Sequence, residues 1–201
     1  MRKIFKEMLI ELALHDEAVV FLTGDLGFEF NAFKDKFPHR YFNMGVCEQT
    51  MIGVAAGMAI EGLKPFVYSI TPFLLERPFE QVKIDLNQQK LNVNLVGYAD
   101  YPGMGPTHEE LDWKVISQML KNTKSFFPTT EEEAKKSIIE AYNYNGPSIV
   151  SLKKALKTDN SLPNQSSGIN QILSQQQSSN QDEFSLSKEK NTGRDYLSRM
   201  H

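Results

Sequence analysis

Short apolar runs alternate with longer amphipathic segments from the N-terminus to about residue 152, and this alternation constrains the fold more than any other feature of the chain. Repeated strand-helix units imply a mainly parallel sheet with helices on both faces, so we predict an α/β three-layer sandwich. Strands are predicted at residues 18–23, 40–43, 65–70, 93–98, 124–127 and 147–152. Helices are predicted at residues 3–15, 47–61, 72–89, 109–120 and 130–143.

The predicted elements end near residue 157, where the composition changes. Residues 158–201 are rich in Ser, Asn and Gln and contain few apolar side chains. Such a segment buries too little surface to offset its ordering entropy. The sequence therefore predicts one domain at residues 1–157, followed by a polar, disordered tail at residues 158–201.

Composition excludes several classes of function. The net charge of -3, with acids and bases interspersed, gives no basic stripe for nucleic acid. One Cys and four scattered His exclude an internal disulfide and a multi-cysteine metal cluster, and they fit a reducing, cytoplasmic compartment. No run reaches the roughly 18 to 20 apolar residues of a membrane span. A soluble cytoplasmic protein without membrane or nucleic-acid partners is expected.

The predicted helix at residues 47–61 carries an unusual combination of side chains. Glu48 and Gln49 stand at its start, and the rest consists largely of Gly, Ala, Val, Ile and Met. Gly53 and Gly57 would let another backbone approach closely, which suggests a buried helix or a subunit interface. Glu48 at the helix start has one simple explanation, because the helix dipole favours an acid there by about 0.3 to 1 kcal/mol.

The wider pattern around this helix resembles a known family. The string Asn43-x-Gly-Val-x-Glu-Gln49, the small-residue helix and the segment at residues 62–66 are similar to the pyrimidine-binding domain of the transketolase and 1-deoxyxylulose-5-phosphate synthase group. Gly-Asp-Leu at residues 24–26, Arg-Pro-Phe-Glu-Gln at 77–81, Gly-Pro-Thr-His at 105–108 and Gly-Pro-Ser at 146–148 follow in the family order. The resemblance covers residues 3 to 156 and implies the thiamine-diphosphate-binding fold.

The resemblance implies that Glu48 is catalytic and binds the cofactor, through a hydrogen bond to a ring nitrogen of the aminopyrimidine. Burial among apolar side chains would favour the protonated carboxyl that this bond requires. Gln49 either contacts the cofactor or makes a structural cap or bridge. Asp25 resembles a family aspartate near the thiazolium ring, although a plain strand-end turn explains it equally well.

The segment at residues 69–83 resembles the one in which an aromatic ring stacks on the aminopyrimidine. Phe73 is the candidate, but it precedes Arg77 by four residues where the family spacing is three, so a gapless alignment places Leu74 there. The alternative for Phe73 is core packing. The resemblance implies that Arg77 binds substrate phosphate, whereas an ion pair with Glu76 or Glu80 is the structural alternative.

The loop at residues 98–108 joins a strand end to a helix start, which is where open parallel sheets place ligand groups. The resemblance implies that His108 is catalytic and contacts substrate oxygens; a solvated turn residue is the alternative. Met104 stands where relatives carry an aspartate, and the loop is shorter than theirs. Asp100 or Tyr101 could compensate in substrate binding.

The chain lacks the complete Gly-Asp-Gly motif with which this group holds Mg²⁺ and the diphosphate, and it lacks the family's third domain. These differences predict a split transketolase-like enzyme that transfers a two-carbon ketol unit between sugar phosphates. A diphosphate-binding partner subunit would hold the metal in a heterotetramer. The alternatives are a 1-deoxyxylulose-5-phosphate synthase half, a subunit of a 2-oxoacid dehydrogenase or decarboxylase with a keto-acid substrate, and a non-catalytic scaffold.

Overall fold

The computed structural model describes residues 1–101 and 103–155, and they build a six-stranded parallel sheet. The strand order is β2-β1-β3-β4-β6-β5, with every neighbouring pair parallel. The strands are β1 (Val19–Thr23), β2 (Tyr41–Asn43), β3 (Lys64–Ile70), β4 (Asn94–Tyr98), β5 (Lys124–Phe126) and β6 (Ser148–Leu152). The four central strands are almost fully buried, as expected for a sheet covered on both faces.

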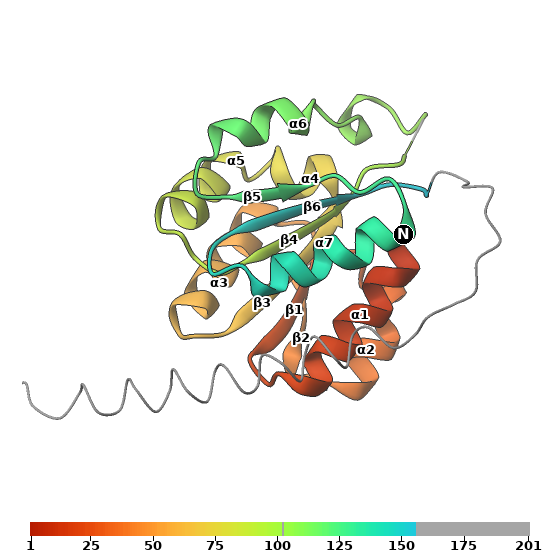
Figure 1. The fold of residues 1–201 in the computed structure, drawn as a ribbon, viewed down its shortest axis with the longest axis vertical. Coiled ribbons are helices and arrows are strands. Elements are labelled where there is room, and N and C mark those ends of the chain that lie inside the picture. Colours follow the sequence, from red (N-terminus) through yellow and green to blue (C-terminus); the bar gives the residue numbers. More distant parts are fainter. Residues whose placement is uncertain (102, 156–201) are drawn as a thin grey trace, which may run out of the picture. The chain divides into compact units, whose positions relative to one another are not determined.

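Helices cover both faces of this sheet (Figure 1). On one face lie α1 (Arg2–His15), α2 (Asn31–Lys36) and α7 (Glu131–Asn143). On the other lie α3 (Glu48–Ile60), α4 (Thr71–Leu75), α5 (Phe79–Gln81) and the π-helical segment η3 (Val82–Gln88). The short helix α6 (Trp113–Ile116) follows β4, and single 3₁₀ turns occur at Gly27–Phe30, Pro38–Arg40, Pro106–His108 and Ser117–Met119. The predicted three-layer α/β sandwich is confirmed.

The two faces of the sheet have different cores. On the α1 side the core is aromatic: the Tyr68 ring stacks on Phe5 at 5.7 Å between centroids and meets the edge of Phe30 at 4.7 Å. On the α3 side the core is aliphatic, with Met51 and Ile52 packed with Val67 of β3. The alternation of side chains along each strand produces this division.

Two predicted helices are shorter or more divided than expected. The helix predicted at 72–89 is interrupted at Arg77 and Pro78, because proline cannot donate a backbone hydrogen bond and its ring disfavours a continuous helix. The helix predicted at 109–120 is reduced to α6 and one following 3₁₀ turn, with Asp112 as its N-cap. The predicted domain boundary at residue 157 and the tail at residues 158–201 lie outside the described residues.

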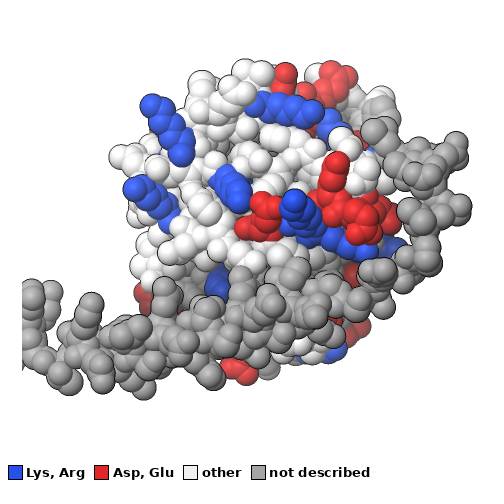
Figure 2. Space-filling model, viewed as in Figure 1, with Lys and Arg blue, Asp and Glu red and all other residues white. Residues whose placement is uncertain are grey.

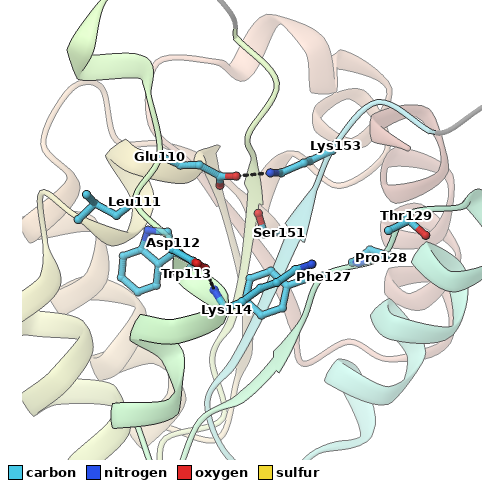
Figure 3. A pocket seen from close by; sticks show the side chains of 10 residues that line it. All are labelled: Glu110, Leu111, Asp112, Trp113, Lys114, Phe127, Pro128, Thr129, Ser151 and Lys153. Atoms are coloured by element: carbon cyan, nitrogen blue, oxygen red, sulfur yellow. Dashed lines mark hydrogen bonds and ion pairs between the residues drawn. The ribbon is translucent and has the colours of Figure 1, made fainter.

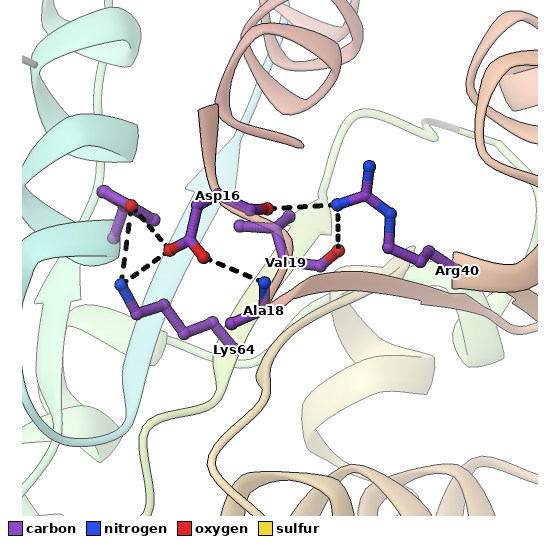
Figure 4. A network of polar contacts seen from close by, with 6 residues as sticks. Asp16, Ala18, Val19, Arg40 and Lys64 are labelled. Carbon is purple, nitrogen blue, oxygen red and sulfur yellow. Dashed lines mark hydrogen bonds and ion pairs between the residues drawn. The ribbon is translucent and has the colours of Figure 1, made fainter. Parts of the chain in front are cut away.

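A polar network fastens the amino edge of the sheet (Figure 4). Asp16 accepts hydrogen bonds from Lys64 Nζ and Tyr142 Oη, each at 2.8 Å, and from the Ala18 amide at 2.9 Å. Arg40 donates to the Asp16 carbonyl at 3.1 Å. Burial of Asp16 opposes its ionisation, yet the hydrogen bonds from Lys64, Tyr142 and Ala18 prevail and lower its pKa. The network therefore ties α1, β1, β3 and α7 together.

Candidate active site

The predicted site residues gather at the carboxyl edge of the sheet. Asp25 follows β1, Phe73 and Arg77 follow β3, and His108 follows β4. Glu48 begins α3, which follows β2. Because all strands run in the same direction, the segments that leave their carboxyl ends share one edge.

Glu48 is buried and ion-paired. Its side chain retains 5% of its exposure, and its Oε1 accepts a hydrogen bond from Arg77 Nη1 at 2.8 Å. The first turn of α3 adds the favourable field of the helix N-terminus. Arg77 therefore pairs with Glu48, not with Glu76 or Glu80, the partners considered from the sequence.

Arg77 lies between Glu48 and an aromatic ring. Its guanidinium carbon is 3.4 Å from the centroid of Phe73, a cation-π contact of about 0.5 to 1 kcal/mol at a partly exposed site. Gln49 Nε2 donates to the Arg77 carbonyl at 3.1 Å, so in this structure Gln49 bridges α3 to the turn after α4. A flat cationic group is thus held against a ring face and a carboxylate at the same time.

Phe73 and Leu74 occupy different environments. Leu74 is fully buried within the aliphatic core, whereas Phe73 is half-buried and faces Arg77. The other neighbour of Phe73 is His108, whose ring meets it edge to face at 4.9 Å. The Phe73 ring therefore contacts two other predicted site residues, Arg77 and His108.

His108 ends the 3₁₀ turn Pro106–His108 and is half-buried. Its Nδ1 lies 3.1 Å from the Thr107 hydroxyl, and its ring also meets that of Tyr101 at 6.2 Å. Glu48, Arg77, Phe73 and His108 therefore form one continuous series of contacts, which the sequence order alone does not show.

This arrangement agrees with the comparison to protein families. The family model described as "Transketolase, pyrimidine binding domain" matches residues 1–158. The chain belongs to this family.

Two curated relatives share about a third of their aligned residues with this pyrimidine-binding domain. One is a 1-deoxy-D-xylulose-5-phosphate synthase of Methylobacillus flagellatus, 34% identical over 74% of this chain and 25% of the relative. Another is a subunit of the apulose-4-phosphate transketolase of Actinobacillus succinogenes, 35% identical over 60% of this chain and 40% of the relative. The chain thus spans well under half the length of these relatives.

Solved structures give the same fold. A structure described as "Split gene transketolase, inactive beta4 tetramer" has a TM-score of 0.70 and 28% identity, covering 80% of this chain and 53% of that one. A transketolase from Campylobacter jejuni superposes with a TM-score of 0.68 at 23% identity, covering 78% of this chain and 26% of that one. The second likeness bears on the fold alone.

The other predicted residues lie apart from the Glu48 pair. Asp25 is exposed and has a φ of 51°, so it forms a left-handed turn at the end of β1. Asp100 is half-buried close to Tyr98, and after burial its charge is the next cause that raises the pKa of Tyr98. Within the described part of the chain, neither residue forms a hydrogen bond or an ion pair with Glu48, Arg77 or His108.

The pyrimidine-binding domain also contains a polar cluster that sequence reasoning missed. Arg2 forms an ion pair with Glu29 and donates a hydrogen bond to Tyr101 Oη at 2.7 Å. Its guanidinium carbon also lies 4.0 Å from the centroid of Tyr98. Arg2 and Tyr101 are 99 residues apart, and nothing in the local sequence around Arg2 marks the contact.

A separate hollow of ≈ 320 Å³ lies beyond the carboxyl ends of β5 and β6 (Figure 3). An ion pair between Lys153 and Glu110 crosses it, and Trp113 forms part of its wall. None of the predicted site residues lines it. The hollow is therefore distinct from the cluster around Glu48.

The outer face of α3 is uncovered by the described part of the chain. A Cβ added at Gly53 or Gly57 would meet nothing within 4 Å, and Ile60 is 62% exposed. Nearby, Val46 is 68% exposed. Within residues 1–101 and 103–155, no other backbone segment packs closely against these small residues.

Among the described residues, neither a metal-ligating cluster nor a membrane-spanning helix occurs. Across the described residues, no three His, Cys, Asp or Glu side chains come together as metal ligands. No described helix has the length and apolar character needed to cross a bilayer. On the face shown in Figure 2, acidic and basic side chains are interspersed.

Proposed function

We propose that this chain is one subunit of a thiamine-diphosphate-dependent, transketolase-like enzyme and supplies the aminopyrimidine side of its active site. The observation that carries the proposal is the placement of Arg77 between Phe73 and Glu48. Membership of the pyrimidine-binding family supports it.

The contacts of Arg77 test whether these residues fit the cofactor. A guanidinium is flat, delocalised and rich in N–H donors, and here it stacks on Phe73 while donating to Glu48. An aminopyrimidine is also flat and delocalised and carries an N–H donor in its exocyclic amine, but its ring nitrogens accept hydrogen bonds. Arg77 thus lies where the cofactor ring is proposed to bind, with Phe73 as a stacking surface. Glu48 accepts a hydrogen bond from Arg77 here, and it would have to be protonated to donate one to the ring nitrogen.

The chain's own residues would act in order. Glu48 would release Arg77, take up a proton and donate a hydrogen bond to the aminopyrimidine ring nitrogen, which orients the ring, with Phe73 as the stacking surface. Arg77, once released at the mouth of the site, would bind the phosphate of a sugar substrate through its planar fork. His108, on the other side of Phe73, would donate a hydrogen bond or a proton to a substrate oxygen. The bound cofactor would supply the carbon nucleophile for transfer of a two-carbon ketol unit.

A partner subunit would complete the site. In the proposed heterotetramer, a second polypeptide would hold Mg²⁺ and the diphosphate. Two relatives support a divided enzyme, since one is described as a single subunit of a transketolase and the other as a split gene transketolase. The beta-only tetramer of the second is described as inactive, which fits a subunit that needs its partner.

Calorimetry of thiamine diphosphate with Mg²⁺ tests the proposal. The titration is made with the chain alone, with the pair formed by co-expressing its genomic neighbour, and with pairs carrying Glu48→Gln or the exposed control Glu80→Gln. Binding by the pair that is lost in Glu48→Gln and kept in Glu80→Gln is expected. A pair that forms but does not bind the cofactor would support the non-catalytic scaffold.

A second candidate reaction is that of 1-deoxy-D-xylulose-5-phosphate synthase, which several relatives at 31% to 36% identity are named for. A donor screen separates it from ketol transfer. Ketose phosphate consumption without CO₂ release would support the transketolase-like reaction, and CO₂ release from a 2-oxoacid would support the synthase or a 2-oxoacid dehydrogenase.

A further inference from the structure

We infer that Arg2 is a positioning residue, which holds Tyr101 against the body of the domain and thereby keeps His108 against Phe73. This placement of His108 is independent of the proposed function. Only its effect on turnover rests on that function.

Arg2 joins the two loops that leave β1 and β4. From the first turn of α1 its guanidinium pairs with Glu29, which belongs to the segment after β1, and donates to the Tyr101 hydroxyl, which belongs to the segment after β4. The guanidinium also covers the ring of Tyr98 at 4.0 Å, at the end of β4 itself. The Arg2 side chain thus connects α1 with the segment that follows β1 and with the segment that follows β4.

The Tyr101 contact is the principal anchor of its loop. Among the described residues from 100 to 104, the hydrogen bond to Arg2 is the only one that reaches the rest of the described chain. Gly103 and Gly105 have φ angles of 78° and 89°, which glycine adopts without strain, so these two turn positions need no side-chain contact to hold their conformation. Without Arg2, the described hydrogen bond nearest to Tyr101 in the first half of the loop would be that from the Ala99 amide to the Leu152 carbonyl at 2.9 Å.

The surroundings of Arg2 favour a fixed side chain. Its side chain retains 23% of its exposure, and Lys6 lies 3.5 Å from the second oxygen of Glu29. The buried hydroxyl of Tyr68 lies under this cluster without a hydrogen-bond partner in the described part of the chain. Burial raises the pKa of Tyr101, so its hydroxyl stays neutral and accepts from the guanidinium.

The anchor reaches His108 through ring contacts. Tyr101 meets Tyr98 at 5.6 Å and His108 at 6.2 Å, and His108 meets Phe73 at 4.9 Å. If Tyr101 leaves Arg2, His108 loses one of the two rings that it contacts. A lysine at position 2 would keep a charge for Glu29 but would lose the planar fork that contacts Glu29 and Tyr101 together.

Histidine-selective NMR of the full chain alone tests this inference without a partner or a cofactor. The ring signals of His108, assigned with His108→Gln, are compared in the parent chain, in Arg2→Lys and in Tyr101→Phe. Both variants are expected to move the His108 ring-proton shifts toward free histidine, because the ring current of Phe73 is lost, and to leave those of His15 and His39 in place. The double variant should add nothing to either single one.

The control is Lys3→Met, since Lys3 is the exposed neighbour of Arg2, with 85% of its side chain accessible. It should leave His108 unchanged. Far-UV circular dichroism will show whether each variant folds. Tyr101→Phe removes a single oxygen atom, so it still tests the inference if an Arg2 variant does not fold. Unchanged His108 signals in a folded Tyr101→Phe chain would overturn the inference.

Turnover adds a readout that does depend on the proposed function. In the active pair, Arg2→Lys should lower kcat/KM for the phosphorylated substrate by about tenfold, since misplacement of a reacting group by an ångström can cost up to about a hundredfold. The dissociation constant of thiamine diphosphate should stay the same. A weakened cofactor affinity would instead show general disruption of the site and count against a positioning role.

Discussion

Glu48 has two possible partners, and the choice between them determines the state of the site. In this structure its carboxylate is occupied by Arg77, which also covers the face of Phe73. In the proposed enzyme the cofactor must take over both contacts. Cofactor binding and the release of Arg77 for a substrate phosphate would then be one event, so the cofactor should bind before the phosphorylated substrate.

Substitution of Arg77 by methionine tests this exchange. We expect thiamine diphosphate to bind the pair two- to fivefold more tightly, because displacement of a partly exposed ion pair costs about 0.5 to 1 kcal/mol. The KM of the phosphorylated substrate should rise by at least about tenfold, because a charge-assisted contact is lost. Calorimetry and initial rates measure both, with Lys83→Met as the exposed control. Weaker cofactor binding in Arg77→Met would contradict the exchange.

Sequence reasoning did not identify side-chain contacts between residues that are far apart in the chain. Glu48 was identified from its place in a motif, but its ion pair was not, because Glu76 and Glu80 are closer to Arg77 along the chain. In the structure Glu76 is engaged by the Leu111 amide and the Trp113 indole. No sequence motif marked Arg2 as a functional residue, since its proposed role depends on a tyrosine 99 residues away.

At the scale of elements, Glu76 links the end of α4 to the start of α6. Its Oε1 accepts from Leu111 N at 2.9 Å and from Trp113 Nε1 at 3.2 Å. Glu76→Ala should lower the free energy of unfolding by about 1 to 3 kcal/mol, because the indole N–H is left without a partner. Trp113 is the chain's only tryptophan, so its fluorescence reports this region directly. An unchanged emission spectrum would show that Glu76 does not hold α6.

The contact between β4 and α4 is a second test at this scale. A Cβ on Gly97 would lie 2.5 Å from Thr71 Oγ1 and 3.0 Å from Thr71 Cα, so the strand and the helix would have to separate. Gly97→Ala should cost about 1 to 3 kcal/mol by overpacking. Gly53→Ala is the matched control, because its added methyl meets nothing and alanine favours a helix. Denaturant unfolding compares the two, and equal stabilities would contradict this packing argument.

Elements with a strong local pattern were predicted well. The buried strands β1, β3, β4 and β6 lie within one residue of their predicted bounds, because central parallel strands are continuous apolar runs. The helix expected at 72–89 was wrong in its continuity, although Pro78 was visible as a breaker. The short α6 could not be read from composition, since its start depends on Asp112 and on contacts with Glu76.

At the scale of the whole molecule, protonation of Asp16 is expected to lower the stability of the fold at acidic pH. Hydrogen bonds from Lys64, Tyr142 and Ala18 lower the pKa of Asp16 in the folded chain below its ordinary value of 3.8, against the opposing effect of burial. A lowered folded pKa stabilises the fold above the unfolded pKa, and this stabilisation is lost as the pH falls through the folded value.

Asp16→Asn tests this linkage. Near pH 7 the variant should be less stable by about 1 kcal/mol, and the two proteins should converge as the pH falls through the lowered pKa of Asp16. Urea unfolding from about pH 7 to about pH 2.5 measures the difference across the window in which such a carboxylate titrates. The control is Asp35→Asn, an exposed aspartate of α2. A difference that stays constant across this range would exclude Asp16 as its source.

The Asp16 network and Glu48 lie at opposite ends of the same strands. A strand of five residues, such as β1, separates the two edges by about 16 Å. Sequence changes that far apart combine additively, so each edge tolerates change without correction at the other. Exposed residues of the segments after β1 and β4 could therefore be substituted without weakening the hydrogen bonds around Asp16 at the other edge.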